Sequence, residues 1–119
     1  MTVRAVTPML VVPDFDATVA FLLDCLGFEA GARMEGYAYC HRDGAAIRVL
    51  QGDAPVAGAG ELIVYIDVDD VDAQFEAHRA ALEALPHGCL RPPFDRDYGQ
   101  REFHAIHGPT TFMVGQSIE

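Results

Sequence analysis

The 119-residue sequence lacks any uninterrupted apolar run near the roughly 20 residues of a membrane helix, although half of its residues are hydrophobic. The first residues, Met1-Thr2-Val3-Arg4, lack the charged-then-apolar pattern of a secretory signal. We therefore expect a cytoplasmic protein that does not contact membranes. A chain of this length can bury roughly two-thirds of its unfolded surface, so a single domain, 1–119, needs no disulfide or metal to fold.

Cysteines and basic residues are both scarce. Cys25, Cys40 and Cys89 are odd in number and form no C-x-x-C pair, which argues against a disulfide framework and against a thiolate metal site. Eight basic residues stand against eighteen acidic ones, and the formal net charge is −10. Such a charge repels phosphate backbones and anionic lipid, so we expect no nucleic-acid partner, whereas a cationic small molecule would be attracted.

Several catalytic signatures are absent as well. The sequence contains no G-x-G-x-x-G or Walker motif, no G-x-S-x-G nucleophile elbow, and no local signature of an activated cysteine. Two carboxylate pairs, Asp14 with Asp16 and Asp70 with Asp72, fit helix starts, where an acidic side chain accepts from free backbone N–H groups. The residues themselves therefore indicate no catalytic group and no cofactor.

One pattern, V-x-D-x-D-A, occurs twice, at 12–17 and 68–73, nearly half the chain apart. In both places an alternating apolar run precedes it and a helical pattern follows it. This repetition predicts a duplicated strand-then-helix unit. The two halves are expected at about 1–51 and 61–119, joined by a Gly- and Pro-containing linker at about 52–60.

The first half predicts the order βαβββ. Asp14 is expected to cap a helix with one apolar stripe, and Gly27 to end it in a left-handed conformation. Arg42-Asp43-Gly44 is a hairpin signal. The expected elements are strands at 5–12, 28–30, 37–41 and 45–50, and a helix at 15–26.

The second half predicts the same order. Asp69 or Asp70 is expected to cap a helix that Pro86 stops, with an apolar stripe that His78 interrupts. Leu62, Val64, Ile66 and Val68 alternate with Ile63, Tyr65 and Asp67, the pattern of a strand with two different faces. The expected elements are strands at 62–68, near 89–90, at 98–106 and at 110–114, a helix at 71–85, a Pro-rich loop at 91–97 and a turn at 108–109.

With both V-x-D-x-D-A copies, F-L-L-D-C-L-G-F at 21–28, Y-G-Q-R-E-F at 98–103 and T-F-M-V-G-Q at 111–116, the chain resembles the glyoxalase, bleomycin-resistance and extradiol-dioxygenase superfamily, also called vicinal oxygen chelate. It looks most like the bleomycin-resistance branch. The resemblance covers essentially the whole chain. It implies an α+β fold in which two βαβββ modules form a curved, funnel-like mixed sheet with helices on the convex side. It also implies a ligand inside the funnel and a homodimer in which the partner chain completes the funnel.

The resemblance further implies metal ligands, mostly His and Glu, on the first and last strands of each module. Aligning the repeats places the first-strand positions at Thr7 and Ile63, and the last-strand positions close to Arg48 and Met113. These side chains cannot bind zinc, iron or manganese, which need imidazole, carboxylate or thiolate. We therefore expect no metal.

Two functions remain open at this point. The first is a metal-independent small-molecule-binding protein that sequesters a cationic or aromatic compound, such as a bleomycin-type antibiotic. The alternative is a metal-dependent lyase, isomerase or dioxygenase whose ligands have moved to His41, His104 or His107. The strand face that points into the funnel could instead serve only to pack the two chains of a dimer.

The expected ligand-binding residues follow from strand alternation and from aromatic side chains near the funnel mouth. Arg101 and Glu102 are expected to pair with groups on neighbouring strands instead. The candidate ligand contacts are Met9, Tyr39, Arg48, Ile63, Tyr65, Asp67, Tyr98, Phe103, His104 and Met113.

Overall fold

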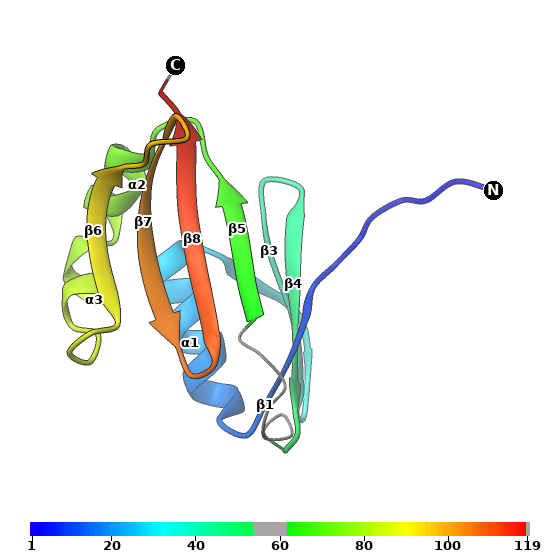
Figure 1. Ribbon diagram of the computed structural model, residues 1–119. Helices are drawn as coiled ribbons and strands as arrows, with labels where there is room; N and C mark the ends of the chain where they lie inside the picture. The colour runs from blue at the N-terminus through cyan, green and yellow to red at the C-terminus, as the bar shows by residue number, and fades with distance from the viewer. Residues whose placement is uncertain (54–61, 119) are drawn as a thin grey trace. The chain divides into compact units, whose positions relative to one another are not determined.

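A computed structural model describes residues 1–53 and 62–118. The contacts divide the chain into two compact units, Met1–Ala59 and Gly60–Glu119. Each unit contains one four-stranded mixed sheet and helix on one side of it (Figure 1). The expected linker, 52–60, lies mostly outside the described residues, and the assignment of both units to a single domain stays a prediction.

The first unit has the predicted order βαβββ. Its strands are arranged β1-β4-β3-β2, with β1 parallel to β4 and the other pairs antiparallel. Strand β1 begins at Met9 and not at residue 5 as expected. Its pairing with β4 extends one residue further toward the N-terminus, where the Pro8 carbonyl accepts from the backbone N–H of Arg48 at 2.9 Å. The elements are β1 (Met9–Val12), α1 (Phe15–Leu26), β2 (Glu29–Met34), β3 (Tyr37–Arg42) and β4 (Ala45–Gln51).

Helix α1 has the predicted limits, and Gly27 ends it with a left-handed φ of 77°. Asp14 is the N-cap residue, but its carboxylate makes no cap bond to the backbone; it accepts from the Thr18 hydroxyl at 3.2 Å. The apolar stripe of α1 is buried against the sheet. At the predicted hairpin, Asp43 and Gly44 have φ values of 49° and 83°, the left-handed pair that a tight two-residue turn requires.

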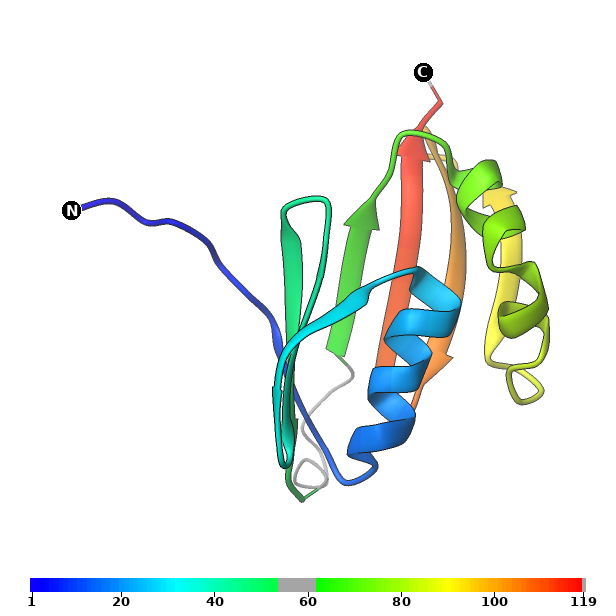
Figure 2. The same ribbon diagram turned by 180° about the vertical axis from the view of Figure 1, so that it is seen from behind.

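The second unit repeats this topology with the strand order β5-β8-β7-β6 and β5 parallel to β8. Helix α2 packs on one face of this sheet (Figure 2). There the Phe75 ring meets the Phe103 ring edge-on, with centroids 5.4 Å apart. The elements are β5 (Leu62–Asp67), α2 (Val71–Ala77), α3 (Arg79–Glu83), β6 (Leu90–Asp95), β7 (Gln100–His107) and β8 (Thr110–Ser117).

The prediction of one continuous helix at 71–85 is wrong. Asp70 does cap α2, accepting from the Ala73 N–H at 3.0 Å, but the helix breaks at His78, whose φ and ψ are −122° and 18°. His78 occupies the place of an apolar residue in the stripe, so a continuous helix would direct an imidazole toward the core. After the break, the turn of α3 buries Leu82 completely instead.

The predicted loop at 91–97 is also wrong, because Leu90–Asp95 forms strand β6 at the edge of the sheet. Two residues, Pro92 and Pro93, stand opposite one residue of β7, Phe103, between the pairs Arg91 with His104 and Phe94 with Glu102. This is a β-bulge, and prolines are tolerated there because the edge strand needs no N–H from them.

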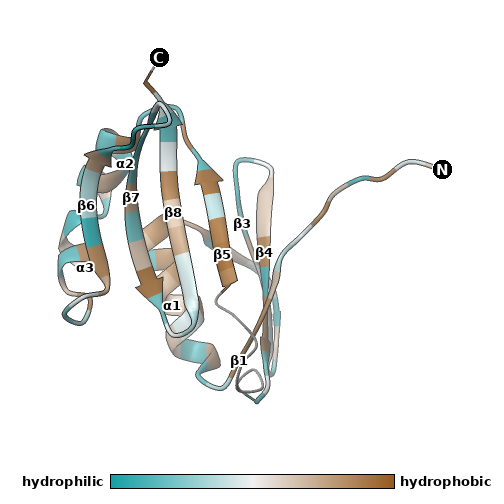
Figure 3. Ribbon diagram, in the orientation of Figure 1, coloured by the Kyte–Doolittle hydropathy of each residue, from teal (hydrophilic) through white to brown (hydrophobic). Residues whose placement is uncertain are grey.

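The final hairpin confirms the turn at Gly108-Pro109, but β8 continues past the expected Val114 to Ser117. Figure 3 shows that β5 consists mostly of hydrophobic residues, whereas β7 carries hydrophilic residues along much of its length. None of the helices in the described residues has the length and apolar composition that a membrane span requires.

Candidate functional site

Polar side chains gather on the face of the second sheet that is opposite α2, which we call its distal face. Along β7, Phe103 and Ala105 point to α2 and are fully buried, so the alternate residues Gln100, Glu102 and His104 point to the distal face. The same parity holds on β5 and β8 through the register pairs Ile63 with Thr111 and Tyr65 with Met113. The predicted orientation of Ile63, Tyr65 and Asp67 away from the helix agrees with this register.

Glu102 lies at the centre of this face, with a side chain that is 0% exposed. Its Oε1 accepts from Arg96 Nη1 at 2.9 Å and contacts His104 Nε2 at 2.7 Å. Its Oε2 accepts from the hydroxyls of Tyr65 at 2.9 Å and Tyr98 at 2.8 Å. We call these five residues the Glu102 cluster. Since a carboxylate offers about four acceptor positions, protein groups fill all of them.

Tyr65 reaches Glu102 because Gly115 lies between them. Tyr65 is on β5 and Glu102 on β7, and the strand that separates them, β8, has Gly115 directly opposite Glu102. A Cβ atom at Gly115 would lie 2.2 Å from the Tyr65 hydroxyl oxygen and 3.0 Å from its Cζ. The tyrosine ring therefore uses the space that the missing side chain leaves. The hydroxyl also lies 3.0 Å from Gln100 Oε1.

The cluster favours the charged form of Glu102 and the neutral forms of Tyr65 and Tyr98. Burial alone raises the pKa of Glu102, but the hydrogen bonds donated by His104, Tyr98 and Tyr65 together outweigh it and hold the pKa below the usual 4.5. Burial, and next the bond to Glu102, raise the pKa of Tyr65 and of Tyr98. At neutral pH the carboxylate is thus charged and the phenols are neutral donors. A carboxylate whose acceptor sites are all filled holds its neighbours in place and is a poor general base.

A pH dependence of stability follows from Glu102. Its folded-state pKa is depressed, so its stabilising contribution is complete above the unfolded-state value of 4.5 and is lost as pH falls through the lower folded-state pKa. We expect the difference in free energy of unfolding between the wild type and Glu102→Gln to be constant near neutrality and to shrink below pH 4.5. Urea unfolding at several pH values measures this difference, and a gap that stays equal down to acid would contradict the role given to Glu102.

Apolar residues adjoin the cluster on the distal face. Ile63 is 54% exposed and Tyr65 38% exposed, although both are large side chains that prefer burial. Met113 lies between them and His104 in the register of the sheet. This face therefore combines an accessible apolar surface with a set of hydrogen-bonding groups that the protein holds in place.

The first unit has a smaller group on its own distal face, opposite α1. Met9 and Tyr39 are both register partners of Arg48. The Arg48 guanidinium lies 5.0 Å from the Tyr39 ring centroid and donates to the Tyr37 hydroxyl at 2.6 Å. The three first-unit residues named from the sequence thus lie side by side.

One candidate residue lies elsewhere. Phe103 is fully buried and packs on Phe75, so it belongs to the core under α2 and not to the distal face. Its placement follows from alternation, since it is adjacent to both Glu102 and His104. Glu102 itself was expected only as a strand-pairing residue. The polar series Gln100, Glu102, His104 beside the apolar Phe103 and Ala105 was the signal that could have identified it.

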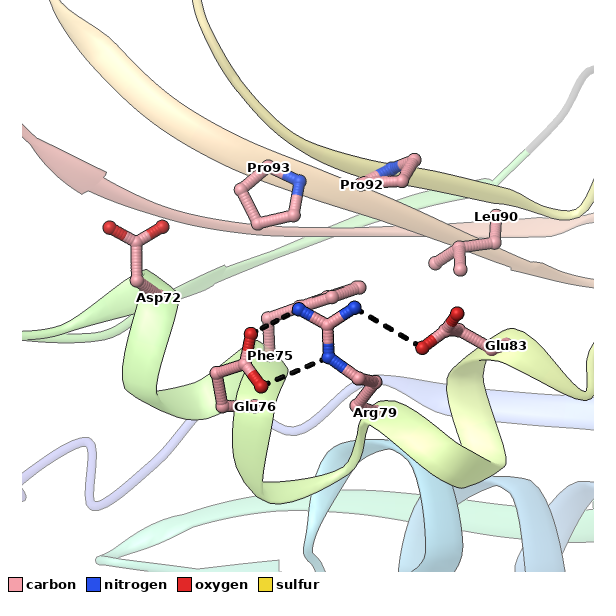
Figure 4. Close-up of a pocket in the computed structure, with 8 residues that line it drawn as sticks. All are labelled: Asp72, Phe75, Glu76, Arg79, Glu83, Leu90, Pro92 and Pro93. Carbon is pink, nitrogen blue, oxygen red and sulfur yellow. Dashed lines mark hydrogen bonds and ion pairs between the residues drawn. The ribbon is translucent and has the colours of Figure 1, made fainter.

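A hollow of about 490 Å³ lies on the helix side between α2, α3 and β6 (Figure 4). Arg79 lies over the Phe75 ring, 5.0 Å from its centroid, and pairs with Glu76 and, at 3.3 Å, with Glu83. Asp72, also in the lining, pairs with Arg101 at 3.0 Å. Each charged group of this groove already has a partner of opposite charge, so the arrangement fits a stabilising surface network.

Comparison with known proteins places this geometry in a family. The model of the Glyoxalase/Bleomycin resistance protein/Dioxygenase superfamily matches residues 4–114. The chain belongs to this superfamily. No curated protein sequence matches it.

Solved structures of the superfamily share the fold at low identity. The bleomycin resistance determinant encoded on transposon Tn5 aligns with a TM-score of 0.76 at 18% identity, covering 97% of this chain and 98% of that one. A bleomycin-binding protein from Streptomyces verticillus, complexed with copper(II)-bleomycin, gives 0.72 at 24% identity, with 100% and 98% covered. A lactoylglutathione lyase from Agrobacterium tumefaciens gives 0.70 at 18%, with 97% and 95% covered. These likenesses show the fold.

The sequence places the metal-ligand positions implied by the resemblance at Thr7, Ile63, Arg48 and Met113. Thr7 precedes β1, whereas Arg48 is opposite Met9, Ile63 is opposite Thr111, and Met113 is opposite Tyr65 and His104. None of the four side chains supplies the imidazole, carboxylate or thiolate that transition metals bind, and His104, the imidazole beside Met113, contacts Glu102. Within residues 1–53 and 62–118 no three His, Cys, Asp or Glu side chains are grouped as a metal site.

The histidines named as relocated ligands lie on two strands, β3 of the first unit and β7 of the second. His104 points to the distal face of the second sheet and bonds Glu102, whereas His107, an odd number of residues later on β7, points to the opposite face. These two imidazoles therefore cannot bind one ion together while β7 keeps its register. His41 is on β3 of the other unit.

Proposed function

We propose that this superfamily member is a metal-independent small-molecule-binding protein that holds an aromatic or amphipathic compound on its distal faces. The observation that carries the proposal is the Glu102 cluster beside the exposed Ile63 and the half-buried Met113. Ligand sites typically combine apolar surface with a few well-placed polar groups, and this face offers both. Because Glu102 saturates its acceptors with protein donors, the polar groups are preorganised before any ligand arrives.

Sequestration is the role that we propose, with a bleomycin-type antibiotic as the first compound to test. Support comes from the fold shared with bleomycin-binding proteins and from a first-strand and last-strand donor set unsuited to metal. A metal-dependent lyase, isomerase or dioxygenase would need ligands from elsewhere, and His104 with His107 does not supply them.

We also propose that the protein acts as a homodimer. Met9, Val11 and Ile63 are each more than two-fifths exposed on the distal faces, and a partner chain would cover part of this apolar surface. Sedimentation at several concentrations measures the assembly. A monomer at all concentrations would contradict this part of the proposal and leave the binding role to be tested separately.

The binding role is tested by calorimetric titration of the protein with metal-free and copper(II)-bound bleomycin after dialysis against a chelator. We expect saturable binding of one ligand per chain at micromolar concentration, in the absence of any protein-bound metal. Arg79→Gln, on the helix side of the second sheet, is the matched control and should bind like the wild type.

Elemental analysis of the purified protein decides between the two functions. Tightly bound stoichiometric zinc, nickel, iron or manganese, together with loss of ligand binding after its removal, would overturn the metal-independent proposal. Absence of binding to either form of bleomycin would remove the resistance role and leave the superfamily membership intact.

A further inference from the structure

The edge of the distal face carries a stack of cationic and aromatic side chains that the proposed function does not yet use. The Arg91 guanidinium lies over the Phe94 ring, with its Cζ 3.5 Å from the ring centroid. The Arg96 guanidinium lies 5.4 Å from the same centroid and 4.8 Å from that of Tyr98. The His104 ring meets Phe94 edge-on at 5.1 Å.

The β-bulge creates this stack. Arg91 and Phe94 are three residues apart and would point to opposite faces of a regular strand. The extra residue at Pro92-Pro93 restores the parity, so that Arg91 pairs with His104 and Phe94 with Glu102, both on the distal face. The prolines themselves line the groove on the helix side. The bulge therefore aims a guanidinium at the face that holds the Glu102 cluster.

Arg91 is available for a ligand, unlike most arginines of the chain. Arg33, Arg42, Arg79, Arg96 and Arg101 each pair with a carboxylate. In the part of the chain that the structure describes, Arg91 is exposed and has no ion pair. A guanidinium that lies over an aromatic ring can still direct its N–H groups outward, and such groups bind a carboxylate or phosphate with two parallel hydrogen bonds.

Two guanidinium groups lie at the β6 edge of the distal face, although the formal net charge of the chain is −10. These are Arg91 and Arg96; the carboxylates that act on the cluster are Glu102 at its centre, Asp67 near Tyr65 and Asp97 near Tyr98. The Glu102 carboxylate is buried and its acceptor positions are filled, so it presents no lone pair to a cation. His104, the register partner of Arg91, contacts Glu102 through Nε2.

We propose that the distal face of β6 and β7 binds an oxyanion, a carboxylate or phosphate, of an aromatic compound, with Arg91 as the forked donor and His104 beside it. The aromatic body would lie on Tyr65, Met113 and Ile63. This inference rests on the proposed function, because it assigns the ligand to the same face. It replaces the cationic class that the net charge suggested with an anionic one.

The test uses defined probes: benzoate, phenyl phosphate and inorganic phosphate, with benzylamine as the cationic counterpart. Binding is followed through the Nε–Hε signals of the arginines in ¹⁵N-labelled protein. We expect benzoate or phenyl phosphate to shift the Arg91 signal with a Kd on the order of 1 mM, as for a ligand of about ten non-hydrogen atoms. Inorganic phosphate should bind more weakly because it lacks the apolar body.

Variants make the assignment specific. Arg91→Gln should weaken oxyanion binding about 10-fold or more, since it removes a charge-assisted pair, and Arg91→Lys should recover part of it. Arg79→Gln is the matched control, because Arg79 also stacks on a phenylalanine but already holds two carboxylates. Thermal unfolding of each variant checks that the fold persists.

The outcomes separate this inference from the proposed function. Benzoate binding that is unchanged in Arg91→Gln, or binding of benzylamine without either aromatic oxyanion, would overturn the oxyanion assignment. If bleomycin binds in that case, the proposed function stands without it. Equal affinity for inorganic and phenyl phosphate would overturn the aromatic part of the assignment. Absence of binding by every probe, bleomycin included, would sink both.

Discussion

Replacing Glu102 with glutamine is expected to lower the free energy of unfolding by roughly 2–3 kcal/mol, because four donors lose a charged acceptor. The largest loss is at Arg96, because its ion pair with Glu102 Oε1, at 2.9 Å, is removed. Its guanidinium has no acceptor for the N–H groups of a glutamine amide. The tyrosine hydroxyls can turn to accept, and Gln100 lies within 3.0 Å of Tyr65, so part of the loss is recovered. The melting temperature should fall by about 5–10 °C.

A matched carboxylate serves as the control for this prediction. Glu76 is exposed, pairs with Arg79 on the helix side, and should tolerate the same substitution, Glu76→Gln, with almost no change in melting temperature. Calorimetry on both variants gives the comparison. Equal melting temperatures for the wild type and Glu102→Gln would mean that the cluster does not stabilise the second unit, and the preorganisation of the distal face would lose its physical basis.

The parts of the fold that the sequence predicted are those where one local signal decides the outcome. Gly27 ends α1 because only a left-handed residue fits there, and Asp43-Gly44 makes the hairpin for the same reason. The alternation along β5 predicted which side chains share a face, because successive residues of a strand point to opposite sides of the sheet. In each case the residues that form the structure are neighbours in the chain.

The parts that sequence reasoning missed depend on pairing between distant segments. Pro92-Pro93 indicates a loop when only its own neighbours are considered, but β7 provides a register in which a bulge at the sheet edge accommodates both prolines. Similarly, His78 only weakened the helical stripe, and the break becomes evident once Leu82 is seen buried in the core. A tertiary partner overrides the local preference in both places.

The sequence predicted several residues on the faces of the candidate site but not the residue at its centre. Tyr65, Tyr98, His104 and Met113 were chosen from alternation and aromatic character, yet the residue that joins three of them, Glu102, was expected only to pair between strands. The bond from Tyr65 crosses a whole strand, so no spacing along the chain encodes it. Gly115, which makes the crossing possible, carries no signal of its own in T-F-M-V-G-Q.

This dependence makes Gly115→Ala a sharp test of the site. The added methyl group would lie 2.2 Å from the Tyr65 hydroxyl oxygen, 3.0 Å from its Cζ and 3.2 Å from the backbone oxygen of Arg101, so the tyrosine side chain must move away from Glu102. We expect a loss of roughly 1–3 kcal/mol in the free energy of unfolding, the usual effect of overpacking. The ionisation of Tyr65, followed by ultraviolet absorption, should fall back toward the usual pKa of 10.0.

A double-mutant cycle with Tyr65→Phe shows whether both effects arise from one contact. In the wild type, Tyr65→Phe removes the hydrogen bond to Glu102, at a cost of about 1–2 kcal/mol. In Gly115→Ala that bond is already broken, so the same substitution should cost almost nothing, and the two losses should fall clearly short of additive. Ser117→Ala, an exposed position at the end of the same strand, should be additive with Tyr65→Phe. Additive losses for the Gly115 pair would show that Tyr65 does not depend on the missing side chain, and the bridge from β5 to β7 would then be held by other contacts.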